Sequence, residues 1–383
     1  RPFIRMLLKA GADPNVVSIK MTLYRMASDS QIVQALIAAA ENGKEVVAMV
    51  ELRARFDEQN NIDWSKQLED AGCTVFYGFD DYKVHSKLTL ITSKVDGKYH
   101  YLTQIGTGNY NEKTSEQYTD LSFITSRQEI GEEASAVFNN MALQRLTSEA
   151  DTMLVAPLRF KSVLLDEMDR QIAKARRGER ASMILKNNSL NDPQIIEKLS
   201  EASCAGVRVD MIIRGICCVR AGVPGKTENI HIRSIVGRYL EHSRIYSFGE
   251  GADARIYIAS GDFLTRNTER RVEVGVRVDD PRIARQLRDI LDLQLRDTVN
   301  ARVMQPDGSY TKVKPADGQP PVDSQMAMYG YFQHAFERID PPGIDPTTPA
   351  RAVGSVTAPR AEPRRDRVRL RGLLESLRGL GQK

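Results

Sequence analysis

Hydrophobic patterns typical of strands and of helices alternate from the start of the chain. Residues 15–25 (NVVSIKMTLYR) and 44–52 (KEVVAMVEL) are apolar runs of strand length. Between them, residues 29–43 (DSQIVQALIAAAENG) repeat apolar positions at helical spacing, with Asp29 or Ser30 suited to the N-cap and Gly43 to the helix end. This order is a βαβ unit. It predicts the α/β class, with a parallel or mixed sheet flanked by helices.

The same unit recurs 163 residues later. Residues 29–46 (DSQIVQALIAAAENGKEV) align without a gap on residues 192–209 (DPQIIEKLSEASCAGVRV), and apolar strands flank both copies. The period is far longer than that of a solenoid repeat, so it indicates a duplicated domain. We predict one α/β domain over 1–152 and a second over 153–337, joined by a mainly helical connector over 151–181.

The texture of the chain changes from about residue 338, where Pro, Ala and Arg dominate. This composition predicts a disordered tail over 338–383, with one short basic amphipathic helix that has Leu370, Leu373, Leu374 and Leu377 on one stripe. Such a helix would allow peripheral membrane contact. Residues 351–383 hold nine Lys/Arg and three Asp/Glu, so the remaining 350 residues hold 45 and 47. The folded body is not basic, which argues against a nucleic-acid-binding surface.

Length and cysteine usage narrow the class further. The 383 residues suit two domains, and no apolar stretch approaches the roughly 20 residues of a membrane span. Cys73, Cys204, Cys217 and Cys218 fit neither a disulfide framework nor a CxxC metal site, which favours a reduced, cytoplasmic protein. The first residues open in the middle of a pattern and without Met, so we expect further sequence before them.

Each copy of the repeat is followed by a histidine motif. Residues 84–91 read VHSKLTLI and residues 241–248 read EHSRIYSF. If each motif is a strand, His85 and Lys87 project from one face about 6.6 Å apart, as do His242 and Arg244. An imidazole beside a cation suits a phosphate, with the ring nitrogen as nucleophile and the cation neutralising the oxygens. A small-residue turn follows each motif, within 101–111 (YLTQIGTGNYN) and 256–267 (IYIASGDFLTRN), and offers backbone N–H groups to an oxyanion.

Two simpler interpretations of the histidines are disfavoured. A single strand histidine is most often structural, but here two occur in register with a domain repeat. Zinc binding would need further ligands nearby, and the other histidines fit no repeat. Arginines also gather at predicted strand ends, where α/β folds bind ligands, and their guanidinium groups pair with phosphate oxygens. These are Arg25, Arg53, Arg55 and Arg214.

The paired HxK/HxR motifs in duplicated α/β domains resemble the phospholipase D superfamily, whose histidines face each other across a central cleft. Within it, the ordered motifs resemble type 1 polyphosphate kinase over residues 1–337. These motifs are IKMTLYR, ELRARFDE, KVHSKL, IGTGNYNEKT, EQYTDLSF, IIRGICC, EHSRIY and TRNTERRVEV. The resemblance implies reversible transfer of the ATP γ-phosphate to inorganic polyphosphate through a phosphohistidine. It also implies Mg²⁺, self-association, and two additional N-terminal domains.

The resemblance assigns roles residue by residue. His85 would be the phosphorylated nucleophile, and His242 would contact ATP and act as an acid/base partner. Arg25 and Arg55 match magnesium-site positions, and because a guanidinium cannot ligate a cation, we expect contact through shared phosphate oxygens. The remaining positions expected to contact ATP or phosphate are Tyr118, Arg214, Lys87, Arg244, Arg53, Asn109 and Arg271.

Two rival functions remain open. A phosphodiesterase of the same superfamily, such as a nuclease or phospholipase, would be expected to have an acidic residue a few positions after each HxK. Neither LTLITSK after Lys87 nor IYSFGE after Arg244 has an Asp at that place. A non-catalytic module that binds polyphosphate through its arginines and basic tail is the other alternative.

Overall fold

The computed structural model describes residues 2–52 and 58–337, and the predicted tail at 338–383, together with Arg53 and Arg55, lies outside the described residues. Residues 1–333 form one compact unit. In the described residues, no helix is both long and apolar enough to cross a membrane.

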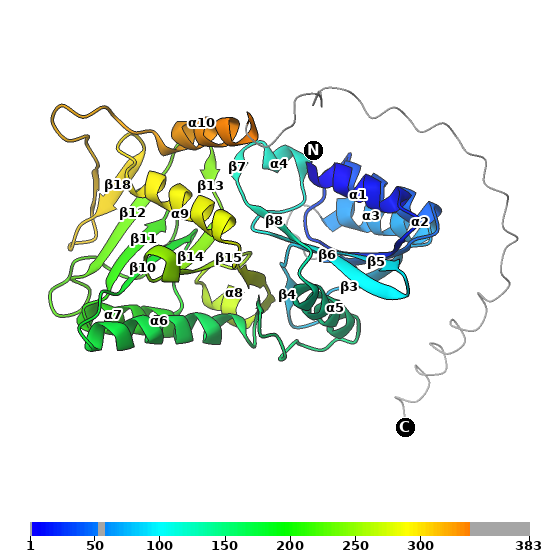
Figure 1. Ribbon diagram of the computed structural model, residues 1–383, viewed down its shortest axis with the longest axis horizontal. Helices are drawn as coiled ribbons and strands as arrows, with labels where there is room; N and C mark the ends of the chain where they lie inside the picture. The colour runs from blue at the N-terminus through cyan, green and yellow to red at the C-terminus, as the bar shows by residue number, and fades with distance from the viewer. Residues whose placement is uncertain (1, 53–57, 338–383) are drawn as a thin grey trace, which may run out of the picture. The chain divides into compact units, whose positions relative to one another are not determined.

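The first half of the chain builds a six-stranded mixed sheet in the order β3-β2-β1-β5-β6-β8 (Figure 1). In chain order, its elements are α1 (Pro2–Ala12), β1 (Val16–Leu23), α2 (Gln31–Glu41), β2 (Glu45–Val50), α3 (Glu58–Asp70), β3 (Thr74–Tyr77), β4 (Lys83–Val84), β5 (Leu88–Val95), β6 (Lys98–Gly106), α4 (Glu112–Ser115), β7 (Tyr118–Thr119), β8 (Ser122–Thr125) and α5 (Gln128–Ala142).

The second half builds a nine-stranded sheet in the order β19-β18-β12-β11-β10-β14-β15-β17-β9. Its elements are β9 (Met153–Val155), α6 (Phe160–Arg176), β10 (Ser182–Asn187), α7 (Pro193–Cys204), β11 (Arg208–Ile213), β12 (Ile230–Ile235), β13 (Leu240–Glu241), β14 (Arg244–Phe248), β15 (Arg255–Ala259), α8 (Thr265–Glu269), β16 (Arg271–Val272), β17 (Val274–Arg277), α9 (Pro281–Leu295), β18 (Ala301–Met304), β19 (Tyr310–Lys312) and α10 (Ser324–Glu337), with a 3₁₀ turn at Gly251–Asp253.

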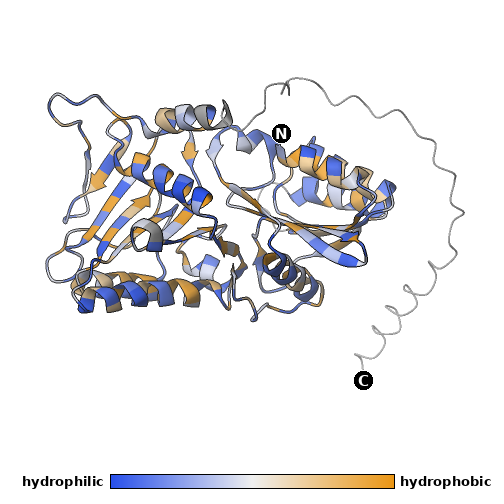
Figure 2. Cartoon of the chain, viewed as in Figure 1, coloured by the Kyte–Doolittle hydropathy of each residue, from blue (hydrophilic) through white to orange (hydrophobic). Residues whose placement is uncertain are grey.

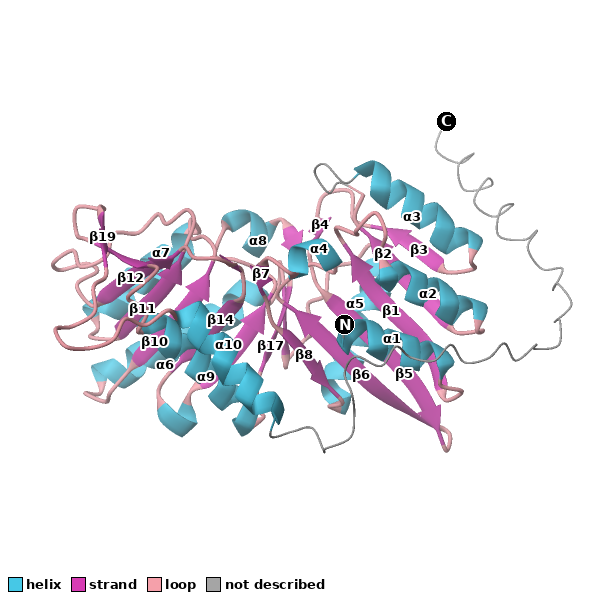
Figure 3. Cartoon of the chain, turned by 90° about the horizontal axis from the view of Figure 1, so that it is seen from above, coloured by secondary structure: helices cyan, strands magenta, loops and turns pink. Residues whose placement is uncertain are grey.

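The duplication predicted from the sequence is confirmed by the strand order. The run β12-β11-β10-β14-β15-β17 repeats β3-β2-β1-β5-β6-β8, and in both sheets the first strand of the βαβ unit pairs in parallel with the second (Figure 3). Helix α2 begins as expected, because the Ser30 side chain caps it by accepting a backbone N–H, and Asp192 caps α7 in a similar way. The expected α/β class with two duplicated domains is therefore correct.

The two halves share part of their hydrophobic interior. One buried cluster belongs to the first sheet and its helices α1 to α3, and a second belongs to α6, α7 and the second sheet. A third cluster draws on both halves and includes α5 and α9. Figure 2 shows hydrophobic residues along the central strands and hydrophilic residues on the outer faces of the helices. The shared cluster fixes the halves against each other, so residues from both can build one site.

Candidate active site

Each histidine motif lies where the chain crosses from one sheet to another. The His85 N–H donates to the Val272 carbonyl at 3.0 Å, continuing the parallel pair β4–β16, whereas Leu88 begins β5 and pairs with β6. In the second repeat, β13 pairs with β7, and Arg244 begins β14. The prediction that His85 and Lys87 lie within one strand was therefore wrong. The physical reason is that residues before and after the motif pair with different halves of the molecule.

The two short parallel pairs connect opposite repeats. Strand β4 belongs to the first half and β16 to the second, while β7 belongs to the first and β13 to the second. Each pair brings the histidine of one repeat beside a carboxylate of the other. The sequence separations are 188 residues for His85 and Glu273 and 122 for His242 and Asp120.

The His85 side chain is held by a buried carboxylate. Its Nδ1 donates to the two Glu273 oxygens at 2.8 and 2.9 Å. Glu273 also accepts from Ser260 at 2.5 Å and from Asn267 at 2.6 Å. Because the carboxylate can only accept, these contacts fix the proton on Nδ1 and leave Nε2 with its lone pair.

The His242 side chain is held in the same way by the first repeat. Its Nδ1 donates to the Asp120 oxygens at 2.8 and 3.0 Å, and Asp120 accepts from the Thr107 hydroxyl at 2.7 Å. Thr107 and Asp120 are 13 residues apart, as are Ser260 and Glu273. Each repeat thus supplies a histidine, a carboxylate and a hydroxyl group. Its hydroxyl group donates to its own carboxylate, which accepts from the histidine of the other repeat; we call these histidine–carboxylate pairs the exchanged contacts.

The electrostatics keep both imidazoles neutral. Burial lowers the pKa of His85 to about 3, and Lys87 and Arg271 act in the same direction against Glu273. Burial and Arg244 lower the pKa of His242 to about 4, against the opposing effect of Asp120. A neutral imidazole is the nucleophilic form, so both rings are in the state that attack on phosphorus requires.

We expect both rings to remain neutral from about pH 8 down to about pH 5, because a lowered histidine pKa delays protonation to more acidic solution. The ¹⁵N resonances of histidine-labelled protein would show this, with His85→Ala and His242→Ala used to assign the signals. A titration midpoint for either ring near the free value of about 6.5 would contradict the expectation.

Three cations lie close to the histidines. Lys87 is only 1% exposed and donates to the His85 carbonyl at 2.5 Å, and burial lowers its pKa to about 7. Arg244 donates to Asp262 at 3.0 and 3.2 Å, and one of its nitrogens lies 3.2 Å from His242 Nδ1. Arg271 lies at the start of β16, and its positive charge helps to lower the pKa of His85.

The predicted nucleotide positions around His242 also come together. The Tyr118 and His242 rings are 5.0 Å apart between centroids. Arg214, which follows β11, donates to the Glu241 carbonyl beside His242. Tyr118 and Arg214 line one cavity of about 520 Å³, with Arg238 and Tyr239 on its wall. The cavity is large enough for a small polar ligand next to His242.

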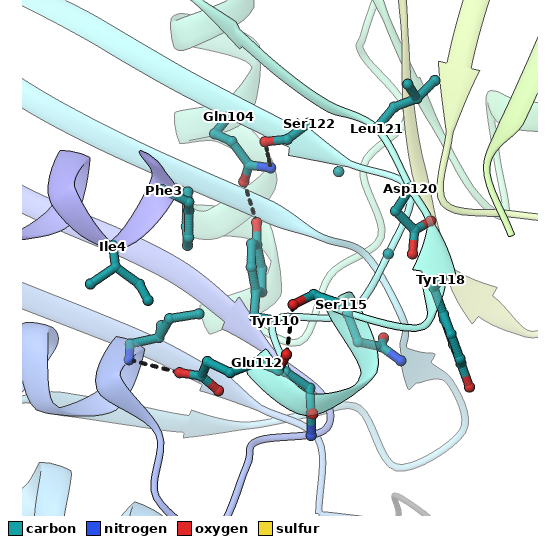
Figure 4. Close-up of a pocket in the computed structure, with 15 residues that line it drawn as sticks. Phe3, Ile4, Gln104, Tyr110, Glu112, Ser115, Tyr118, Asp120, Leu121 and Ser122 are labelled. Carbon is teal, nitrogen blue, oxygen red and sulfur yellow. Dashed lines mark hydrogen bonds between the residues drawn. The ribbon is translucent and has the colours of Figure 1, made fainter. Parts of the chain in front are cut away.

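The first repeat has its own neighbouring cavity, of about 250 Å³ (Figure 4). Asn109, Tyr118 and Asp120 line it, and Tyr110, Gln104 and Ser122 form a hydrogen-bonded chain along it. Arg25 lies over the Tyr24 ring, which in turn packs edge-on against His85 at 4.9 Å between centroids. Most of the predicted site residues that the structure describes therefore border the histidines or these cavities. Arg25 contacts Tyr24, which packs on His85, and Arg53 and Arg55 lie outside the described residues.

Sequence reasoning missed the carboxylates Asp120 and Glu273. From the sequence, we considered only acids shortly after each HxK motif. In the structure, the acid that orients each histidine belongs to the other repeat. A signal was present: the two repeats share a hydroxyl residue in the small-residue turn and an acid 13 positions later. Each histidine therefore has a carboxylate partner although no Asp stands at the expected place after its HxK or HxR motif, so the missing Asp does not by itself exclude diester chemistry.

The His, Cys, Asp and Glu side chains of the described residues do not form an evident metal site. Within residues 2–52 and 58–337, no group of three or more His, Cys, Asp or Glu side chains is placed to hold a metal ion. The carboxylates nearest the histidines already accept from His85, His242 and Arg244. The described residues therefore do not fit a resident metal ion.

Comparisons with known proteins agree with this geometry. The family models for polyphosphate kinase C-terminal domain 1 and domain 2 match residues 1–147 and 153–325. A polyphosphate kinase from Staphylococcus haemolyticus is 44% identical over 327 residues, which is 85% of this chain and 45% of that protein. The solved polyphosphate kinase of Porphyromonas gingivalis has a TM-score of 0.82 at 34% identity, over 88% of this chain and 51% of that one.

A more distant likeness concerns the fold alone. The phosphatidylserine synthase of Haemophilus influenzae superposes with a TM-score of 0.56 at 11% identity, over 88% of this chain and 92% of that chain. Fold and site together define a duplicated α/β protein with one histidine from each repeat. The chain belongs to the polyphosphate kinase family and contains its two C-terminal domains. It spans about half the length of the curated relatives it matches.

Proposed function

We propose that this chain is the catalytic part of a polyphosphate kinase, which moves the γ-phosphate of ATP reversibly onto inorganic polyphosphate through a phosphohistidine on His85. The observation that supports this best is the His85–Glu273 contact. It holds a neutral imidazole with Nε2 available as nucleophile, inside a group of cations suited to phosphoryl oxygens.

In the first step, the Nε2–P bond forms as the bond from phosphorus to the β-phosphate oxygen breaks, and ADP leaves with the electron pair. The ring then carries a positive charge, which Glu273 stabilises through Nδ1–H. Lys87 and Arg271 neutralise the phosphoryl oxygens. A nearby phosphate favours the charged form of Lys87, whose pKa of about 7 otherwise leaves it partly neutral.

In the second step, an oxygen of the terminal phosphate of the polymer attacks phosphorus. The P–N bond breaks, and His85 returns to its neutral form with the polymer one unit longer. His242, held by Asp120 and neutral, can accept a proton or a hydrogen bond at its Nε2 as phosphate groups exchange. The P–N bond has a high transfer potential, so both steps run in reverse when ADP and polymer are abundant.

ATP and Mg²⁺ enter this scheme as one substrate. We propose that the cation arrives on the β- and γ-phosphates, and that Arg25 and Arg55 contact the same oxygens, because guanidinium groups bind phosphate and not metal. Tyr118 and Arg214 would hold the nucleotide phosphates beside His242. Self-association, and membrane contact by residues 338–383, stay predictions from the sequence.

Replacement of Arg214 by Ala should raise KM for ATP by about 10- to 100-fold, because a charged hydrogen-bond donor to phosphate is lost. Arg214→Lys keeps the positive charge but loses the paired N–H donors of the guanidinium group, so its KM for ATP should lie between the wild-type and alanine values. Initial rates at varied ATP, with melting curves to confirm folding, would measure this. An unchanged KM in folded Arg214→Ala would contradict the assignment.

The proposed function is tested by three assays on the protein at its full natural length. With ATP and Mg²⁺ we expect polymer and ADP, and with ADP and polyphosphate we expect ATP. Cleavage of a model phosphodiester without phosphoryl transfer would favour the diesterase alternative. Polyphosphate binding without turnover, retained in a variant lacking both His85 and His242, would favour a binding module.

A further inference from the structure

Asn109 and Asp262 hold the same position in the two repeats. Each comes two residues after the hydroxyl group, of Thr107 or Ser260, that donates to the orienting carboxylate of its own repeat. The glycine between lies against that carboxylate in both repeats. The equivalence is therefore fixed by structure, yet one position is a neutral amide and the other an acid.

Asp262 is committed to contacts within the protein. It is buried, accepts from the Arg244 Nε at 3.0 Å and from its terminal nitrogen at 3.2 Å, and accepts from the Asn188 backbone and side chain at 2.9 and 3.1 Å. Arg244 also donates to the His242 carbonyl at 2.7 Å. The cation that follows His242 is thus already neutralised by a carboxylate one guanidinium group away from the ring.

In the first repeat, the cation that follows the histidine has no acid at the position equivalent to Asp262. Lys87 is the counterpart of Arg244, and Asn109 brings no charge to the position of Asp262. The Asn109 Oδ1 is buried, and no hydrogen-bond partner for it occurs among the described residues. The charges that act on His85 are two cations, Lys87 and Arg271, and one anion, Glu273.

The charges near His242 balance differently. Two cations, Arg244 and Lys87, act on this ring against Asp120, and Asp262 adds a second acid on the Arg244 guanidinium. A phosphoryl group brings about two negative charges at neutral pH. It is therefore favoured on the His85 side, where the nearby cations outnumber the anions, over the His242 side, where Asp262 makes the two numbers equal.

We propose that Asp262 is a specificity-determining residue that makes the two histidines unequal: by neutralising Arg244 it confines the phosphoryl group to His85, while the equivalent Asn109 leaves the charge of Lys87 for the substrate. The inference rests on the proposed phosphotransfer function. It adds a residue that decides which of two similarly held histidines becomes phosphorylated.

The first test places an acid in the first repeat. Asn109→Asp gives the first repeat the acid that the second repeat has at position 262, whereas Asn109→Ala removes the amide without adding charge. With [γ-³²P]ATP and the full-length protein, we expect Asn109→Asp to label at least about tenfold more slowly than Asn109→Ala, with a melting temperature no lower than wild type. Equal labelling rates for the two variants would overturn the proposal.

The second test removes the acid of the second repeat. His85→Ala should show no label, whereas His85→Ala with Asp262→Asn should gain acid-labile label on His242, located by mass spectrometry of peptides kept at alkaline pH. A structural role alone would not move label to a new histidine. A double variant that folds and shows no label would count against the proposal. If it does not fold, the Asn109 pair decides.

The outcome for wild type separates this inference from the function on which it rests. Wild-type protein that carries no phosphohistidine, or carries it on His242, would remove the proposed function itself. Label on wild-type His85, combined with equal rates for the two Asn109 variants, would remove only the role given to charge at positions 109 and 262.

Discussion

His85→Ala is expected to abolish both ATP-dependent labelling of the protein and polymer synthesis, lowering the rate by at least about a thousandfold. The reason is that alanine removes the nitrogen that forms the P–N bond, and the structure holds this nitrogen neutral and oriented for attack. Labelling with [γ-³²P]ATP, followed by gel analysis without acid, measures the first effect, and polymer assays measure the second.

A matched control distinguishes this loss from a general effect of replacing histidine. His100 lies on β6 and is exposed, away from the exchanged contacts, so His100→Ala should retain labelling and synthesis. Acid-labile label that persists at the wild-type level in His85→Ala would show that another residue is the phosphoryl acceptor.

The second large effect is expected for Glu273→Gln. The amide keeps the size of the side chain, but it neither stabilises the charge that develops on His85 nor fixes the Nδ1–H tautomer, so kcat should fall by about 10² to 10⁴-fold. Burial alone would raise the pKa of Glu273, but His85, Lys87 and Arg271 outweigh it and lower that pKa to about 2. The carboxylate is thus ionised throughout the working pH range.

Steady-state kinetics of Glu269→Gln provide the control for Glu273→Gln. Glu269 lies on α8, its side chain is 48% exposed, and it pairs with Lys161 rather than with a histidine. Its replacement should leave kcat within about threefold of wild type, as is usual for an exposed ion pair. A similarly small effect for Glu273→Gln would contradict the role of the exchanged carboxylate.

The sequence predicted the repeat and the start of α2 because both depend on local patterns. The βαβ alignment of residues 29–46 with 192–209 reappears as matching strand order, and Ser30 and Asp192 cap the two helices. Periodicity and capping residues act over one turn or one strand, so a single sequence reveals them.

The exchanged contacts could not be predicted in the same way. Glu273 lies 188 residues from His85, and Asp120 lies 122 residues from His242, so only the packing of the two halves brings them together. The strand predicted across His85 and Lys87 was wrong for the same reason: β4 pairs with β16 of the other half, and the chain then crosses to its own sheet. Local alternation of residues contains no information on which half supplies the partner.

The most direct test of the account is to find where the phosphoryl group resides in wild-type protein. The full-length protein is incubated with ATP and Mg²⁺, digested at alkaline pH, and its peptides are sequenced by mass spectrometry under conditions that preserve phosphohistidine. We predict phosphate on His85 alone, discharged by added ADP to give ATP. Phosphate on His242, on another residue, or on none during active polymer synthesis would contradict the account.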